Sequence, residues 1–315
     1  MFRLKLIPAK TQIRFMGIRK LAFTLSGLLV VASLAIFLTQ GLNKGIDFEG
    51  GILIEVGTEG PADLALMRSV VGGIGLGEVA LQEFGSPDDV LIRIERQPGG
   101  AEAQQVAVES VKTALDPAFP GISYRRVEFV GPKVSGELVE AASLAVLTAV
   151  VVMLIYIWLR FEWHFSVGAV VALVHDVAIT LGMFAVTGIE FNLSSVAAIL
   201  TIVGYSINDT VVVYDRIREN LRKYKQQPLP DVLDLSINDT LSRTVMTSLT
   251  TLLALGALFF FGGEVIRGFS FAMIFGVAIG TYSSIFVAAP VLITLGLKRG
   301  MGVDSGDEAE TNAAK

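Results

Sequence analysis

Cysteine is absent from the 315 residues, and charged residues make up only 17% of them. The lack of cysteine excludes disulfides, thiolate metal sites and cysteine nucleophiles. The shortage of charge, with 52% hydrophobic residues and a mean hydropathy of +0.63, excludes an ordinary soluble protein of this length. Walker-type phosphate loops and His-Glu-Xaa-Xaa-His helices are missing too, so we expect no ATPase, no metal, no cofactor and no covalent chemistry.

The apolar residues are gathered into runs near the length that a membrane-spanning helix needs, about 18 residues or more. The first run could belong to a secretory signal peptide, but it ends in Thr39-Gln40-Gly41, which is a poor cleavage site. We therefore predict a retained first helix over 21–40. Five more spans are predicted within 134–297, so that the six runs are 21–38, 138–159, 165–186, 193–213, 245–261 and 269–295.

Lysine and arginine collect on every second link between these runs. Because cytoplasmic loops carry an excess of basic residues, this pattern predicts that residues 1–20 are cytoplasmic and that 41–133 lies outside the membrane in the periplasm. The link 214–244 is then cytoplasmic, either as an amphipathic surface segment or as a solvated basic loop. The tail 298–315 is predicted to be cytoplasmic and disordered, because it is polar and acidic.

The polar insert 41–133 has the pattern of a small folded domain. Strands are predicted at 52–56, 78–84, 90–94 and 122–130, and helices at 61–71 and 101–115. This βαββαβ order is the ferredoxin-like arrangement. The predicted fold is therefore an α-helical polytopic membrane protein with six transmembrane helices and one α+β ferredoxin-like periplasmic domain between helices one and two.

Ionisable residues break the apolar pattern at three places. His175 and Asp176 lie about 16 Å along the third predicted helix, Asp209 lies in the fourth, and Arg243 opens the fifth. A charge near the bilayer centre costs roughly 2.5–3.5 kcal/mol on insertion scales, so such groups usually face the bundle interior.

Polar residues recur around these groups at helical spacing. Tyr205 and Asn208 accompany Asp209 on the fourth helix, and Thr247 and Thr251 accompany Arg243 on the fifth. Since the two helices run antiparallel, we predict that Arg243 reaches Asp209 and that protonation of Asp209 weakens the pair. The alternatives are an ordinary basic flank at Arg243, structural hydrogen bonds at Asp209 and at His175-Asp176, and packing faces made by the threonines.

Several segments resemble the SecD/SecF family of protein-export membrane proteins. The entry motif around Gly45, Asp47, Gly50 and Gly51 follows the first predicted helix, and the most specific run ends the fourth. The matching segments are Gly45-Ile46-Asp47-Phe48-Glu49-Gly50-Gly51, Val130 to Leu138, His175-Asp176, Gly204 to Asn220 and Arg243 to Thr251. They span residues 45–251, and the six-helix layout covers nearly the whole chain.

The resemblance implies an RND-type protein that pairs with a separate SecD subunit in the inner membrane. It implies that this pair assists the SecYEG channel and, indirectly, the SecA ATPase. The pair would draw the translocating preprotein outward with the energy of protons moving down their gradient. In the family, the residues matching Asp209 and Arg243 are implicated in proton coupling. Nucleic acid is not an implied partner.

Other functions remain open at this point. The chain could be a scaffold that only holds its partner against the channel, or part of a small-molecule exporter. An intramembrane aspartyl protease is disfavoured, because Tyr214-Asp215 has no Gly-Xaa-Gly-Asp partner.

Overall fold

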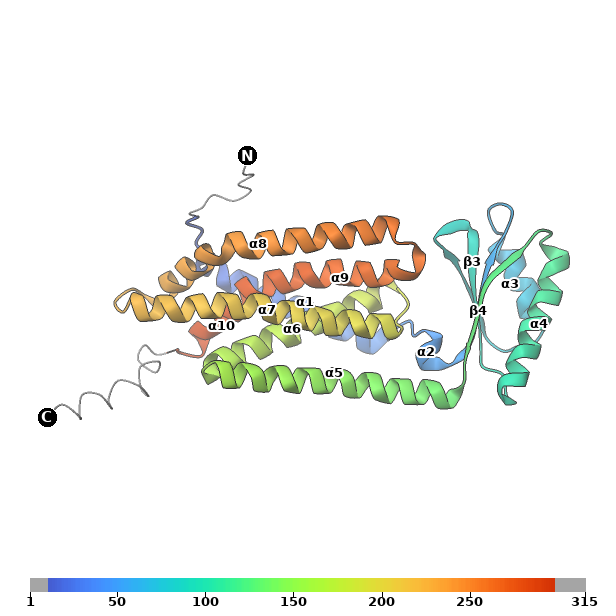
Figure 1. The fold of residues 1–315 in the computed structure, drawn as a ribbon, viewed down its shortest axis with the longest axis horizontal. Helices are drawn as coiled ribbons and strands as arrows, with labels where there is room; N and C mark the ends of the chain where they lie inside the picture. The colour runs from blue at the N-terminus through green and yellow to red at the C-terminus, as the bar shows by residue number, and fades with distance from the viewer. Residues whose placement is uncertain (1–10, 298–315) are drawn as a thin grey trace.

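Six long apolar helices form an elongated bundle in the computed structural model, which describes residues 11–297 (Figure 1). The predicted amino-terminal segment up to residue 10 and the tail 298–315 lie outside the described residues. A single 3-10 turn, η1 (Phe15–Ile18), precedes the bundle. Its helices are α1 (Arg19–Gln40), α5 (Pro132–Arg160), α6 (Trp163–Thr187), α7 (Leu193–Lys223), α8 (Leu229–Phe261) and α9 (Glu264–Ser283).

The sixth span changes its helical winding near its end. After α9 the chain forms a π-helix, η2 (Ser284–Ala288), and then α10 (Ala289–Thr294). Pro290 explains the change, because it has no N–H to donate to the carbonyl of Phe286 one α-helical turn earlier. In a π-turn a carbonyl accepts from the N–H five residues later instead of four, so the Phe286 carbonyl no longer depends on an N–H at position 290.

The segment 214–244, predicted to be a cytoplasmic link, is helical over most of its length rather than a loop. α7 continues to Lys223 and α8 already begins at Leu229, so only residues 224–228 are outside a helix. Most of the basic residues here lie on helix ends that extend beyond the apolar runs, and Lys225 lies in the connection 224–228. Hydropathy marks the part of a helix that suits lipid, and the backbone hydrogen bonding continues past it.

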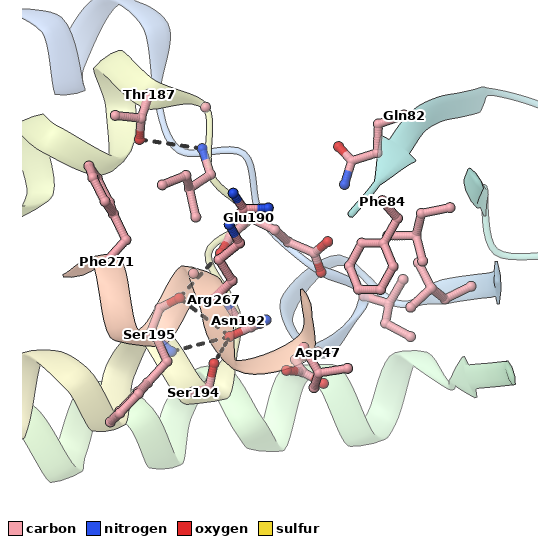
Figure 2. A pocket seen from close by; sticks show the side chains of 18 of the residues that line it. Asp47, Gln82, Phe84, Thr187, Glu190, Asn192, Ser194, Ser195, Arg267 and Phe271 are labelled. Carbon is pink, nitrogen blue, oxygen red and sulfur yellow. Dashed lines mark hydrogen bonds between the residues drawn. The ribbon is translucent and has the colours of Figure 1, made fainter. Parts of the chain in front are cut away.

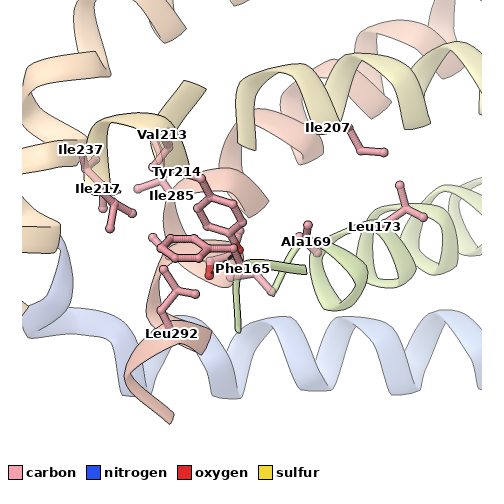
Figure 3. Close-up of a cluster of buried hydrophobic side chains, with 14 of the residues drawn as sticks. Phe165, Ala169, Leu173, Ile207, Val213, Tyr214, Ile217, Ile237, Ile285 and Leu292 are labelled. Carbon is pink, nitrogen blue, oxygen red and sulfur yellow. Dashed lines mark hydrogen bonds between the residues drawn. The ribbon is translucent and has the colours of Figure 1, made fainter. Parts of the chain in front are cut away.

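The bundle core forms where α6, α7 and the end of the sixth span meet (Figure 3). The Phe165 and Tyr214 rings pack edge to face, with centroids 5.1 Å apart. The Tyr214 hydroxyl donates to the Ala288 carbonyl at 3.0 Å, so this large side chain is buried with its polar atom satisfied. α5, in contrast, has no buried residues in its apolar window and lies at the edge of the bundle.

The domain between α1 and α5 is a four-stranded antiparallel sheet with two helices on one face. The strands β1 (Gly51–Gly57), β2 (Val79–Phe84), β3 (Ser86–Ile94) and β4 (Ser123–Val130) pair in the order β2-β3-β1-β4. The alternating side chains Ile52, Ile54 and Val56 pack under α3 (Leu64–Gly72) and α4 (Gly100–Ala118). The predicted fold class, six spans and a βαββαβ domain, is confirmed.

Short connections join this extramembrane domain to the bundle. α1 leads through the single-turn helix α2 (Ile46–Glu49) into β1, and a single residue, Gly131, separates β4 from α5. The helices α3 and α4 cover the face of the sheet that points away from the bundle (Figure 1). The opposite face, which carries Leu53 and Leu91, therefore lies toward the loops of the bundle.

Candidate functional site

Asp176 on α6 lies at the centre of the bundle and is 1% exposed. The Ser206 hydroxyl on α7 and the Ser283 hydroxyl on α9 donate to its Oδ2 at 2.5 and 2.7 Å. Its Oδ1 is 2.8 Å from Nδ1 of His175, the neighbouring residue. Nε2 of His175 is buried without a hydrogen-bond partner among residues 11–297. Three helices thus converge on one carboxylate.

Asp209 on α7 forms a second buried carboxylate site and is 9% exposed. The Thr244 hydroxyl on α8 donates to Oδ1 at 2.7 Å, and the Ser284 hydroxyl donates to Oδ2 at 2.5 Å. Hydrogen bonds to an ionised carboxylate are shorter and stronger than neutral ones. Both oxygens of Asp209 are therefore satisfied by protein hydroxyls within a membrane-spanning bundle.

Sequence reasoning missed the hydroxyls of the sixth span. Ser283 and Ser284 are adjacent in the chain, yet they bond carboxylates on two different helices. Thr281, in the same turn, is 2.7 Å from the Ser248 hydroxyl of α8, which in turn accepts from Tyr205. The available signal was the polar sequence Thr281-Tyr282-Ser283-Ser284 within the apolar run 269–295.

Arg243 lies on the outer surface of α8 and is exposed, as is Asn208 on α7. Among residues 11–297, no ion pair within 4.0 Å joins Arg243 to Asp209, so the predicted direct contact is not formed. Thr244, the next residue, is turned inward and occupies that place. Thr247 and Thr251 bond carbonyls of their own helix rather than Asp209. The structure thus unites Asp209 with Thr244 and Ser284, and leaves Arg243 at the bundle surface.

The glycine-rich entry motif connects the extramembrane domain to the loop before α7. The Gly45 N–H donates to the Phe191 carbonyl at 2.8 Å, and Asp47 accepts from the N–H of Leu193 at 2.9 Å, at the start of α7. Gly50 and Gly51 have φ values of +73° and +124°, which L side chains rarely adopt. A Cβ on Gly51 would also lie 2.7 Å from the Ile94 carbonyl oxygen. The motif therefore joins the sheet to the bundle through both backbone and side-chain hydrogen bonds.

A cavity of about 480 Å³ lies between the inner face of the sheet and the bundle loops (Figure 2). It is bordered by Phe84 and Gln82 of β2, by Glu190 and Asn192 of the loop before α7, and by Phe271 of α9. Glu190 is held by Arg93 of β3 at 2.9 Å. Residues 11–297 contain no group of three or more His, Asp or Glu side chains placed to share a metal ion.

Six apolar spans around buried carboxylates, with a βαββαβ domain after the first span, define a polytopic membrane protein with ionisable groups inside its bundle. The family described as protein export membrane protein SecD/SecF, C-terminal, matches residues 110–298, and the SecD/SecF GG motif matches residues 35–62. The chain belongs to the SecF branch of this SecD/SecF family, whose curated members are protein translocase subunits.

The similar proteins include curated relatives and solved structures. The protein translocase subunit SecF of Cereibacter sphaeroides is 50% identical over 95% of this chain and 94% of its own length. That of Rhodobacter capsulatus is 49% identical over 100% and 98%. The crystal structure of SecDF, a translocon-associated membrane protein from Thermus thermophilus, is 35% identical, with a TM-score of 0.83 over 95% of this chain. This chain spans only 40% of that SecDF chain.

Proposed function

We propose that this chain couples the proton gradient to protein export. Together with a SecD subunit, it assists and completes the passage of preproteins through SecYEG after the SecA-driven step. The observation that carries this proposal is the placement of Asp209. It is buried in a membrane-spanning helix and accepts hydrogen bonds from α8 and from the sixth span. Asp176 and His175 form a second group of the same kind.

Protonation provides a physical means of coupling. A carboxylate can only accept hydrogen bonds, whereas a protonated carboxyl must also donate one. Gaining a proton at Asp209 therefore changes its bonds to Thr244 and Ser284, which hold α8 and the sixth span against α7. Intramembrane carboxylates held in this way are typical of proton relays in transporters.

An exposed polar stripe on α7 and α8 supports a partner within the membrane. Thr201, Asn208, Arg243 and Thr247 are exposed on the surface of the described chain, although they lie on helices otherwise suited to lipid. Polar side chains in spans generally face other helices. We propose that SecD covers this stripe and brings a group that pairs with Arg243.

The distribution of basic residues supports an orientation in the bacterial inner membrane. Arg14 lies just before η1, Lys20 lies in the first turn of α1, and Arg222 and Lys223 lie at the end of α7, all at the same end of the bundle. By the positive-inside rule this end is cytoplasmic. Both termini are then cytoplasmic, and the extramembrane domain is periplasmic.

The test is an Asp209→Asn substitution in inner-membrane vesicles that contain the SecD partner. We expect loss of gradient-dependent preprotein release, because asparagine keeps the side-chain size but cannot take up a proton. Asp215→Asn is the matched control: Asp215 lies on the same helix and makes an exposed ion pair with Arg160. Release that survives in Asp209→Asn supports a scaffold role and contradicts the coupling proposal.

A further inference from the structure

Two adjacent serines at the junction of α9 and η2 contact the two buried carboxylates separately. Ser283 donates to Asp176 on α6 and Ser284 donates to Asp209 on α7. Both serines have 0% exposure. Ser206 of α7 also donates to Asp176, from a position one helical turn before Asp209. The two carboxylates are thus joined through the backbone of the sixth span and through that of α7.

Each serine also has a second acceptor within reach. The Ser283 hydroxyl is 3.1 Å from the Gly280 carbonyl oxygen, and the Ser284 hydroxyl is 3.0 Å from the Thr281 carbonyl oxygen. A hydroxyl has one hydrogen and two acceptor lone pairs. It donates to the carboxylate while that group is charged. When the carboxyl is protonated, its own hydrogen goes to the serine oxygen, and the serine hydrogen turns to the backbone carbonyl.

The backbone at this point is already wound irregularly. Ser284 is the first residue of the π-helix η2, and π-turns are frequent at functional sites. α9, which leads into η2, carries Phe269 and Phe271 toward its amino-terminal end, and both line the cavity beneath the sheet. A rearrangement of hydrogen bonds at Ser283 and Ser284 therefore acts on a helix that runs from the carboxylates to the extramembrane domain.

We propose that Ser283 and Ser284 are positioning residues that couple Asp176 to Asp209 and convey their protonation to α9. Each serine acts through its carboxylate. His175 is the titratable group beside Asp176, and Arg243 is the charged group near Asp209. The transport consequence rests on the proposed function, whereas the hydrogen-bond coupling can be tested without it.

Infrared spectroscopy of the purified chain in lipid nanodiscs tests the coupling directly. Asp176→Asn and Asp209→Asn assign the carboxyl bands. We expect Ser284→Ala to shift the Asp209 band and Ser283→Ala to shift the Asp176 band. Ser270→Ala is the matched control, because Ser270 is a buried serine of α9 whose hydroxyl has no partner among residues 11–297; it should change neither band.

The coupling itself is read from the paired substitutions. In the otherwise native chain, Asp209→Asn should shift the Asp176 band. When Asp209→Asn is made in a chain that also carries Ser283→Ala and Ser284→Ala, it should cause no such shift. An unchanged shift overturns the proposal. Where an alanine variant fails to fold, the same serine is replaced by threonine, which keeps the hydroxyl. The threonine variant should show the native carboxyl bands, and altered bands count against the proposal.

Release measurements separate this inference from the proposed function. Ser284→Ala should lower gradient-dependent release about ten-fold, the effect of losing one hydrogen bond to a charged group. The same substitution should have no further effect when added to Asp209→Asn. If Ser284→Ala lowers release by the same factor in the native chain and in Asp209→Asn, the serine has only a structural role and the inference is overturned. Full release in Asp209→Asn overturns the proposed function instead, and leaves the infrared test valid.

Discussion

Arg93 of β3 holds the inner face of the sheet against the bundle, and its removal should loosen the extramembrane domain. Its guanidinium pairs with Glu190 at 2.9 Å, and both side chains are only 19% exposed. It also donates to the Asn43 side chain at 3.2 Å and to the Lys44 carbonyl at 2.9 Å. One side chain therefore joins the sheet, the segment after α1 and the loop before α7.

The size of the effect follows from these three contacts. A hydrogen bond to a charged group contributes about 1.5–3 kcal/mol and a neutral one about 1 kcal/mol. After allowing for partial replacement by water, we expect Arg93→Ala to weaken docking by roughly 3 kcal/mol, about a hundred-fold in the equilibrium between docked and undocked domain. Glu190→Gln should cost less, since an amide keeps one hydrogen bond to Arg93.

Spin-label distance measurements can detect this change, and the absence of cysteine makes the labelling simple. Cysteines placed at Gln105 on α4 and Val265 on α9, both exposed, report the distance between domain and bundle. Arg93→Ala should broaden the distance distribution, and Arg68→Ala, an exposed arginine of α3, should not. A distribution for Arg93→Ala as narrow as that of the native chain would refute the reasoning.

Two further predictions concern the extramembrane domain. Gly51→Ala should destabilise this domain by about 1–3 kcal/mol, because the φ of Gly51 is +124° and a Cβ there would meet the Ile94 carbonyl. The control Gly131→Ala should be near neutral, because Gly131 has a φ of −77° and lies in open space. Equal shifts of the thermal unfolding temperature in the two variants would contradict this prediction. Burial and a hydrogen bond to Asp116 raise the pKa of Tyr124 above its ordinary value near 10. The unfolded chain then loses this proton first, so stability should fall as pH rises above about 10, and Tyr124→Phe should flatten that fall in unfolding titrations.

The fold class was readable from the sequence because its signals are local. Long apolar runs mark spans, the distribution of basic residues favours an orientation, and alternation marks strands. Helix ends were less accessible: α7 and α8 continue into polar sequence, where hydropathy no longer reports helicity. The glycine motif was visible as a pattern, but its positive φ values and its bond to the loop before α7 depend on residues about 150 positions apart.

In the candidate site, too, some features were predictable from the sequence and others depended on the tertiary structure. Sequence alone identified Asp176 and Asp209, since a carboxylate within an apolar run is conspicuous and costly. It also suggested Arg243 as the partner of Asp209, because antiparallel helices bring the two residues to a similar depth. Tertiary structure decided otherwise: the rotation of α8 about its axis turns Thr244 inward and Arg243 outward.

The sequence by itself determined that the chain spans a membrane six times, carries a βαββαβ domain and holds carboxylates among its apolar helices. Only the tertiary structure decided which hydroxyls meet those carboxylates. Ser283 and Ser284 look like ordinary small residues in a span until α6, α7 and the π-turn are packed together. Helical spacing gives the face of each residue on its own helix, but the partner across a contact depends on how several helices are rotated and shifted against one another, which no local pattern encodes.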